Sequence, residues 1–179
     1  MEGEGSTVRT RQKDRNVPPP RAPWNEVDEC LWMGGHEWVD EHGELNDAVV
    51  NDEFDVVVSL YTRPGHGPRR GVEHVVYEIP DGPLTSQQIQ KVAELARWTA
   101  EQVRMRRKVL VRCHAGYNRS GLLAAQCLIE RTHTPRQAIE LVRRARTDEP
   151  LNNELFVDYL TTGLDVAYLL AGLAEPELS

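Results

Sequence analysis

Residues 108–121 read Lys-Val-Leu-Val-Arg-Cys-His-Ala-Gly-Tyr-Asn-Arg-Ser-Gly and carry the signals that decide the fold. The β-branched and aliphatic run at 109–111 predicts a buried strand, and the apolar run that follows at 122–129 predicts a helix. Between the two lies a short loop in which Gly116 permits a tight backbone turn. The order strand, loop, helix predicts an α/β fold with this loop at the carboxyl end of a strand.

A loop that leads into a helix N-terminus is suited to bind an anion. The first backbone N–H groups of a helix have no partner within the helix, and the helix dipole is positive at that end. Arg119 adds a planar guanidinium that matches phosphate oxygens two at a time. The predicted phosphate-binding loop therefore consists of His114, Ala115, Gly116, Tyr117, Asn118 and Arg119.

Cys113 directly precedes this loop, so its sulfur is expected beneath a bound phosphorus atom. Cysteines at helix N-termini or beside cations are often thiolates at neutral pH, which makes them nucleophilic. Ser120 supplies a hydroxyl that can donate to the thiolate or assist it as a leaving group. These residues predict nucleophilic attack on a phosphate ester through a cysteinyl-phosphate intermediate.

The stretch from Cys113 to Gly121 resembles the signature loop of the cysteine-based protein tyrosine phosphatases, specifically their dual-specificity branch. The resemblance implies that Cys113 is the nucleophile, that Arg119 binds the phosphate, and that neither a metal nor another cofactor is required. It also implies a central, mainly parallel sheet of four to five strands. The order of the elements places helices on both faces of this sheet.

One position departs from the family pattern. The family usually has a histidine immediately before the cysteine, whereas this chain has Arg112 there and a histidine directly after it, His114. Side chains alternate along a strand, so Arg112 can point away from Cys113, and its effect on the nucleophile is open. For His114 two interpretations stand, an exposed loop residue or a group that supports the site.

A second loop supplies a candidate proton donor. Residues 79–83 read Ile-Pro-Asp-Gly-Pro and precede a long predicted helix. Cleaving a phosphate ester needs a proton for the departing oxygen and later a base for the attacking water. The segment resembles the general-acid loop of the dual-specificity family, which implies that Asp81 is the general acid. The alternative is that Asp81 serves turn formation alone; Asp55, expected within a strand, is a weaker candidate for the acid.

The remaining elements follow from periodicity and from turn and capping residues. The sequence predicts further strands at 30–33, 54–60 and 72–79, and helices at 85–106, at 134–145 and from 152 onward with a break near Gly163. It also predicts a short helical piece at 44–51.

The length, composition and charge of the whole chain limit the possible architectures and partners. Its 179 residues, 40% of them hydrophobic, fit one domain with a tail. Residues 1–23 end in a proline-rich run and predict a disordered or extended tail, either a docking arm or a solvated leader, and residues 24–175 are the predicted phosphatase-like domain. The net charge of −7 argues against a DNA partner, and the absence of a long apolar run argues against a membrane span or a signal peptide.

Three cysteines without C-x-x-C spacing predict a reducing compartment, the cytoplasm, and no metal site. Cys30 is expected to be a small buried residue, with redox pairing to Cys113 as the alternative. Cys127 falls on the apolar face of the helix that follows the loop, which predicts a core residue. The protein is expected to act as a monomer.

The substrate is less determined than the reaction. The family resemblance favours proteins that carry phosphotyrosine and phosphoserine or phosphothreonine. Phosphoinositides, inositol phosphates and RNA ends are alternatives, which Arg63, Arg69 and Arg70 of the predicted loop 61–71 would suit. Two other classes stay open, a phosphate-binding module without turnover and a sulfurtransferase, although the latter has no need of an acid such as Asp81.

Overall fold

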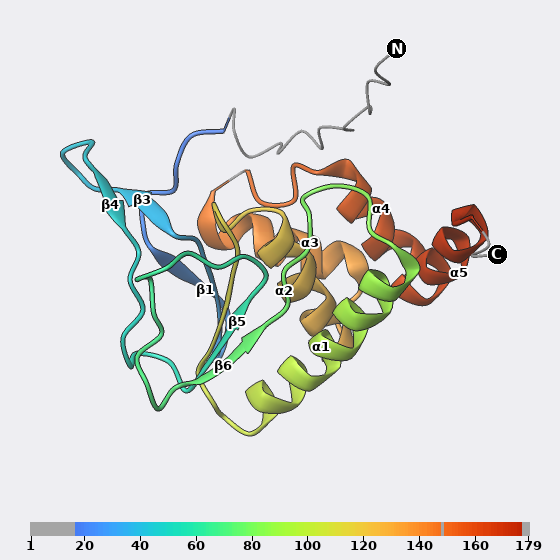
Figure 1. The fold of residues 1–179 in the computed structure, drawn as a ribbon, viewed down its shortest axis with the longest axis horizontal. Coiled ribbons are helices and arrows are strands. Elements are labelled where there is room, and N and C mark those ends of the chain that lie inside the picture. Colours follow the sequence, from blue (N-terminus) through green and yellow to red (C-terminus); the bar gives the residue numbers. More distant parts are fainter. Residues whose placement is uncertain (1–16, 148, 177–179) are drawn as a thin grey trace, which may run out of the picture.

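The computed structural model describes residues 17–147 and 149–176, and it has the predicted α/β architecture (Figure 1). The central sheet has five strands in the order β1-β2-β7-β5-β6. β1 is antiparallel to β2 and the other pairs are parallel, which confirms the mainly parallel sheet. The strands are β1 (Trp24–Asp28), β2 (Leu31–Gly34), β5 (Val56–Ser59), β6 (Glu73–Val76) and β7 (Val109–Arg112).

The helices begin where the capping residues predict. Thr85 and Thr134 each form a capping box, in which the threonine side chain and a glutamine three residues later satisfy N–H groups of the first turn. Gly163, at φ +98°, ends one helix and precedes the next, as expected. The helices are α1 (Ser86–Arg104), α2 (Arg119–Glu130), α3 (Pro135–Arg146), α4 (Glu154–Thr162) and α5 (Leu164–Ala174).

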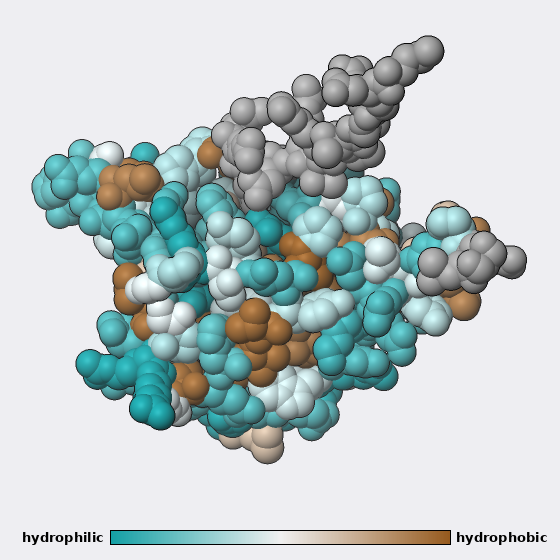
Figure 2. All heavy atoms as spheres, in the orientation of Figure 1, coloured by the Kyte–Doolittle hydropathy of each residue, from teal (hydrophilic) through white to brown (hydrophobic). Residues whose placement is uncertain are grey.

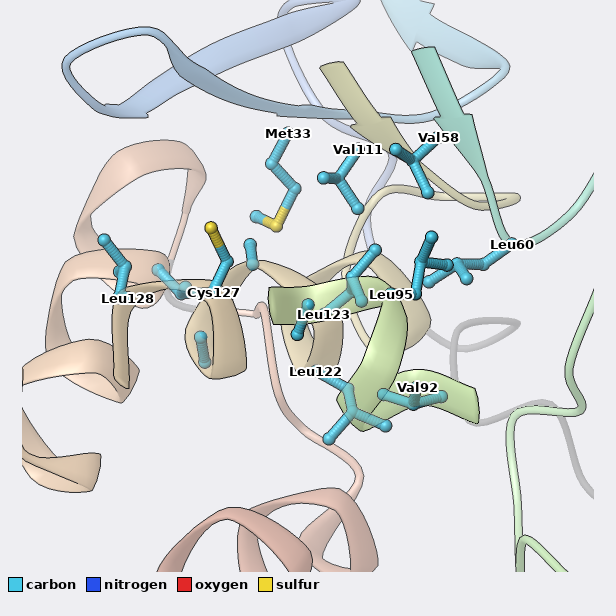
Figure 3. Packing of buried hydrophobic residues seen from close by; sticks show 14 of the residues in the cluster. Met33, Val58, Leu60, Val92, Leu95, Val111, Leu122, Leu123, Cys127 and Leu128 are labelled. Carbon is cyan, nitrogen blue, oxygen red and sulfur yellow. The ribbon is translucent and has the colours of Figure 1, made fainter. Parts of the chain in front are cut away.

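The helices lie on one face of the sheet, so the expectation of helices on both faces is wrong. Buried residues from all five helices join Val56, Val58, Val109 and Val111 in one hydrophobic cluster (Figure 3). The opposite face carries a smaller cluster of Val50, Phe54, Val57 and Leu110. The segments that cross this second face, residues 40–55 and 60–72, contain no helix. In the second segment, the glycines together with Pro64 and Pro68 favour turns and loops.

Residues 44–51 form a strand and a loop, which corrects the predicted helical piece. β3 (Glu37–Val39) and β4 (Leu45–Asp47) pair as an antiparallel hairpin. The Asp40 carboxylate accepts the N–H groups of His42 and Glu44 and so closes the turn between them. The apolar residues of this segment resemble one face of a helix, but a local side-chain bond to the backbone competes with helix formation.

Residues 17–23 run along the domain without regular secondary structure, and we call them the N-terminal strap. The Pro20 carbonyl accepts from the Val39 N–H at 2.8 Å, and the Pro23 carbonyl accepts from the Gly35 N–H at 3.3 Å. The rest of the predicted tail, residues 1–16, lies outside the described residues. Strap residues that were assigned to the tail are therefore bonded to the domain.

The surface in Figure 2 is mainly hydrophilic, with hydrophobic side chains in separate patches. Among the described residues, no single helix is both long and apolar enough to cross a membrane. α4 and α5 meet that criterion only when taken together, and they are bent by 114° at Gly163.

Candidate active site

The phosphate loop connects the central strand β7 to the N-terminus of α2, as predicted. All four residues of β7 are buried, so the loop starts from the most enclosed part of the sheet. Gly116 has φ +76°, and a Cβ there would lie 2.5 Å from the carbonyl carbon of Gly34. A Cβ on Gly35 would lie 2.7 Å from the carbonyl of Ala115. The loop therefore packs backbone against backbone on the Gly-Gly end of β2, which only glycine permits.

Cys113 precedes this loop and Ser120 follows it, and their side chains lie together. The Cys113 side chain is fully buried, and its Sγ lies 3.3 Å from the Ser120 Oγ. Ser120 is in the first turn of α2, where the helix dipole favours negative charge. The hydroxyl can donate to the sulfur when the thiol has lost its proton. The structure thus brings together two of the predicted catalytic residues.

The Arg119 side chain is buried, with an exposed fraction of 3%. Its Nη1 lies 3.4 Å from the Ile79 carbonyl, a long hydrogen bond, and its guanidinium lies 5.2 Å from the centre of the Tyr61 ring. Within the described residues, its Nε and Nη2 have no hydrogen-bond partner. A buried cation with unsatisfied donors is unfavourable unless a ligand completes it.

Asp81 lies next to the phosphate loop, although 32 positions separate it from Cys113 in the sequence. Its side chain is 4% exposed, and both carboxylate oxygens accept hydrogen bonds from asparagine amides. Asn118 Nδ2 donates to Oδ2 at 3.0 Å, and Asn153 Nδ2 donates to Oδ1 at 2.7 Å. The predicted acid therefore forms a hydrogen bond with a residue of the phosphate loop.

Arg112 points to the opposite face of the sheet from Cys113. Its Nε donates to the Ser59 Oγ at 3.2 Å, and its Nη1 and Nη2 donate to the carbonyls of His66 and Gly67 at 2.9 and 2.5 Å. Burial lowers the pKa of Arg112 to about 10, which leaves the side chain charged at neutral pH. Arg112 is thus a structural anchor for the loop after β5, and its guanidinium points away from Cys113.

Cys30 lies too far from Cys113 for a disulfide. The Cys30 carbonyl accepts from the Val109 N–H, so Cys30 lies at the start of β7 and Cys113 lies beyond its end. Four strand residues span about 13 Å, whereas a disulfide needs Cα atoms within about 7 Å. Cys127 is a core residue, as predicted; it belongs to the same hydrophobic cluster as Met33 (Figure 3), and burial raises the pKa of its thiol to about 12.

The side chains of Tyr117 and Arg146 make contacts that fix the phosphate loop. The Tyr117 hydroxyl donates to the Pro18 carbonyl of the N-terminal strap at 2.7 Å, and the ring is 1% exposed. Arg146, the last residue of α3, lies 6.0 Å from the centre of that ring and 3.5 Å from the Ala115 carbonyl. Burial lowers the pKa of Arg146 to about 10, so it adds a positive charge behind the loop. Arg146 was not predicted, because nothing local distinguishes it from the other arginines of α3.

Tyr61 and three histidines lie on the other side of the loop. The Tyr61 ring packs edge-on against His36 and His114, with ring centres 5.5 and 5.1 Å apart, and His66 lies 5.1 Å from His36. His114 is therefore half-buried against an aromatic ring beside Arg119, which favours the supporting interpretation. Tyr61, His36 and His66 were not predicted as part of this region, because pairing in the sheet brings them here: His36 follows β2, and Tyr61 and His66 follow β5.

Loop 61–71 places one of its three arginines at the edge of the sheet that carries the phosphate loop. Arg63 follows β5 and pairs with Glu37. Arg69 lies 3.8 Å from Asp52, and its N–H donates to the Asn51 carbonyl. These partners precede β5, so Arg69 and the neighbouring Arg70 lie toward the edge of the sheet where the parallel strands begin. The loop crosses the whole face and does not gather its arginines around Cys113.

No protein-family model and no curated protein matches this sequence. Solved structures do match it. Human DUSP28 aligns with a TM-score of 0.61 and 17% identity over 83% of this chain and 99% of the other. The chain has the fold of the dual-specificity phosphatases. A mouse putative dual specificity phosphatase aligns at TM-score 0.57 and 19% identity, over 84% and 92% of the two chains. Tk-PTP aligns at 0.55 and 24%, over 78% and 97%.

These neighbours share the dual-specificity phosphatase fold with the chain at low sequence identity. The alignments cover nearly the full length of each neighbour, so the likeness extends beyond the signature loop to the whole catalytic domain. The fold and the loop motif are independent observations, since the motif comes from nine residues and the fold from the whole sheet and its helices.

Proposed function

We propose that the protein is a cysteine-dependent phosphatase that hydrolyses phosphate monoesters through a cysteinyl-phosphate intermediate. The observation that carries the proposal is the buried guanidinium of Arg119, two of whose nitrogens have no partner within the described part of the chain. A phosphoryl group would supply acceptor oxygens that fit this fork. It would bind at the N-terminus of α2, next to the sulfur of Cys113.

In the first step, the Cys113 thiolate attacks phosphorus and the bond from phosphorus to the leaving oxygen breaks. Asp81 gives that oxygen its proton. Two contacts support this role, because the loop that carries Asp81 touches the phosphate loop at Asn118 and again where the Ile79 carbonyl meets Arg119. Proton transfer by a positioned carboxylic acid accelerates such steps by about 10²–10⁴-fold.

In the second step, water attacks the cysteinyl phosphate and gives a proton to Asp81, and the bond from phosphorus to sulfur breaks. The Ser120 hydroxyl, 3.3 Å from the sulfur, donates to the departing thiolate. Inorganic phosphate leaves. Arg119 and the amides of the phosphate loop hold the phosphoryl oxygens in both steps, where preorganised donors lower the barrier most.

We propose phosphotyrosine and phosphoserine or phosphothreonine proteins as the substrates. The fold neighbours include structures described as dual-specificity phosphatases, which supports this choice by analogy. Polyphosphorylated ligands would benefit from several free cations around the site. Arg63 is paired with Glu37, and Arg69 and Arg70 lie toward the other edge, so the structure gives less support to inositol phosphates and RNA ends.

The test of the reaction is release of p-nitrophenol from p-nitrophenyl phosphate with a chelator present. The wild type should turn over, Cys113→Ser should not, and the control Cys30→Ser should retain the wild-type rate because Cys30 lies at the far end of β7. Turnover that survives in Cys113→Ser would contradict the mechanism. No turnover by the wild type would favour the phosphate-binding module.

The substrate class is tested on the same enzyme with peptides that carry phosphotyrosine, phosphoserine or phosphothreonine, and with inositol phosphates and 5′-phosphorylated RNA. Release of phosphate from the peptides at a kcat/KM above that for the other two classes would support the proposal. The opposite order would contradict the protein substrate and leave the reaction standing.

A further inference from the structure

Asp81 is held at both of its carboxylate oxygens by asparagines from two different parts of the chain. Asn118 belongs to the phosphate loop, and Asn153 precedes α4. Asp81 is 4% exposed, so this contact takes place out of water. A carboxylate fixed at two points has a defined orientation, whereas one fixed at a single point can rotate.

The Asn118 side chain is fully buried and uses each of its polar atoms. Its Nδ2 donates to Asp81 and, at 3.0 Å, to the Asn152 Oδ1. Its Oδ1 accepts from the Asn153 N–H at 3.0 Å. The side chain that precedes Arg119 in the phosphate loop therefore points away from the phosphate position and bonds to the acid and to the segment before α4.

Asn153 completes the arrangement from the other side. Its Oδ1 accepts from the Leu155 N–H and caps α4, while its Nδ2 donates to Asp81. The amide thus has two separate tasks, one for the helix with its oxygen and one for the acid with its nitrogen. A serine at this position would keep the cap but could not reach the acid as the longer amide does.

We infer that Asn118 and Asn153 are positioning residues that hold Asp81 in its proton-transfer orientation, so that the acid loop is a fixed part of the site. This inference rests on the proposed function, in which Asp81 is the general acid. Each carboxylate oxygen has a second lone pair that can carry the transferred proton while the amides stay bonded. The phosphate loop, the acid and the start of α4 then act as one unit.

The experiment compares two esters that differ in their need for an acid. Phenoxide is a much stronger base than p-nitrophenoxide, so phenyl phosphate depends more on a proton from Asp81 than p-nitrophenyl phosphate does. Asn153→Ser and Asn118→Ala should lower kcat on phenyl phosphate by about 10- to 100-fold, the range that misplacement of a catalytic group produces. The loss on p-nitrophenyl phosphate should be several times smaller.

Two controls separate positioning from general damage. Thr134→Ala removes the cap of α3 without touching Asp81, and it should leave the ratio of the two rates unchanged. In an Asp81→Asn background, Asn153→Ser should cause no further change in that ratio. An equal loss on both esters, or the same additional loss in the Asp81→Asn background, would overturn the inference while the phosphatase reaction stands.

A measurement of stability covers variants that fold poorly. The measurement is the Tm of Asp81→Asn, of Asn153→Ser and of the double variant. Because the two residues share one hydrogen bond, the decrease in Tm of the double variant should be smaller than the sum of the two single decreases. Additive shifts would contradict the contact. A wild type that hydrolyses neither ester would overturn the proposed function, and with it the inference.

Discussion

Arg112 and Arg119 are both buried, lie seven positions apart, and make opposite use of a guanidinium. Arg112 donates from Nε, Nη1 and Nη2 to a hydroxyl and two carbonyls on one face of the sheet. Arg119, near the other face, has one long hydrogen bond and two nitrogens without a partner within the described residues. All three guanidinium nitrogens of Arg112 have partners within the described residues, whereas two of those of Arg119 have none. Unused donors, rather than burial or charge, distinguish Arg119 from Arg112 and agree with its proposed role in binding phosphate.

The largest effect is expected from Arg119→Met, which keeps an unbranched apolar stem and removes the donors. The rate on p-nitrophenyl phosphate should fall by at least about 100- to 1000-fold, the loss seen when preorganised donors are removed. Stability should stay the same or increase, because a buried cation with few partners disappears. Urea unfolding beside the activity assay checks both, and a large loss of stability would contradict the comparison.

Arg112→Met is the matched variant and should show the reverse pattern. Two buried carbonyls and the Ser59 hydroxyl lose their donor, at a cost of about 1 kcal/mol or more each. The free energy of unfolding should fall by about 3 kcal/mol, measured by urea titration. The folded fraction should keep a rate within a few fold of wild type. A rate loss as large as that of Arg119→Met would show that Arg112 acts on the nucleophile after all.

The Arg112 region also predicts a dependence of stability on pH. His36 is fully buried, and burial together with the charge of Arg112 lowers its pKa from 6.5 to about 4. Between about pH 6.5 and 4, His36 therefore binds a proton in the unfolded chain but not in the folded chain. The free energy of unfolding keeps the full contribution of neutral His36 above about pH 6.5, and it decreases as the pH falls toward 4. The loss is about 3 kcal/mol at pH 4 and levels off just below that pH.

His36→Gln serves as the comparison, because its amide can still donate to the Tyr61 carbonyl that accepts from His36 Nε2 at 3.1 Å. Urea unfolding from pH 7.5 to 4 should show a shallower decline for the variant than for the wild type. Parallel curves would mean that carboxylates elsewhere account for the acid sensitivity.

The smallest effect is expected at the bond between the phosphate loop and the N-terminal strap. Tyr117→Phe removes the hydroxyl that donates to the Pro18 carbonyl and keeps the buried ring. Stability should fall by about 1 kcal/mol, the usual net value of one hydrogen bond. The rate should change less than in any Arg119 variant. A larger rate loss in Tyr117→Phe than in Arg112→Met would show that the strap controls the shape of the loop.

The sequence predicted those features that depend on neighbouring residues. The strand, loop and helix around Cys113 follow from local periodicity, and the caps at Thr85 and Thr134 follow from adjacent side chains. The roles of Cys113, Arg119, Ser120 and Asp81 stay predictions, which the structure supports by placing the four residues in or beside one loop.

What the sequence could not predict depends on contacts between distant residues. The partners of Arg112 are carbonyls of His66 and Gly67, whose positions follow from the path of a long loop. The sequence predicted Asn118 as part of the phosphate loop, but not that its side chain bonds to Asp81. The direction of a side chain in a loop does not follow from the regular alternation that holds in a strand. The hairpin of β3 and β4 is set by a turn at Asp40 that competes with an apparent helical pattern.

The close packing of the phosphate loop on Gly34 and Gly35 has a consequence for the order of folding. Leu31 of β2 pairs with Val109 of β7 although 78 positions separate them, and pairings of high sequence separation form slowly. The phosphate loop packs on the end of β2, so it is assembled only after β2 and β7 have paired. In a nascent or partly folded chain, Cys113 would lack the phosphate loop around it. Its reactivity toward phosphate esters would therefore appear only with the native state.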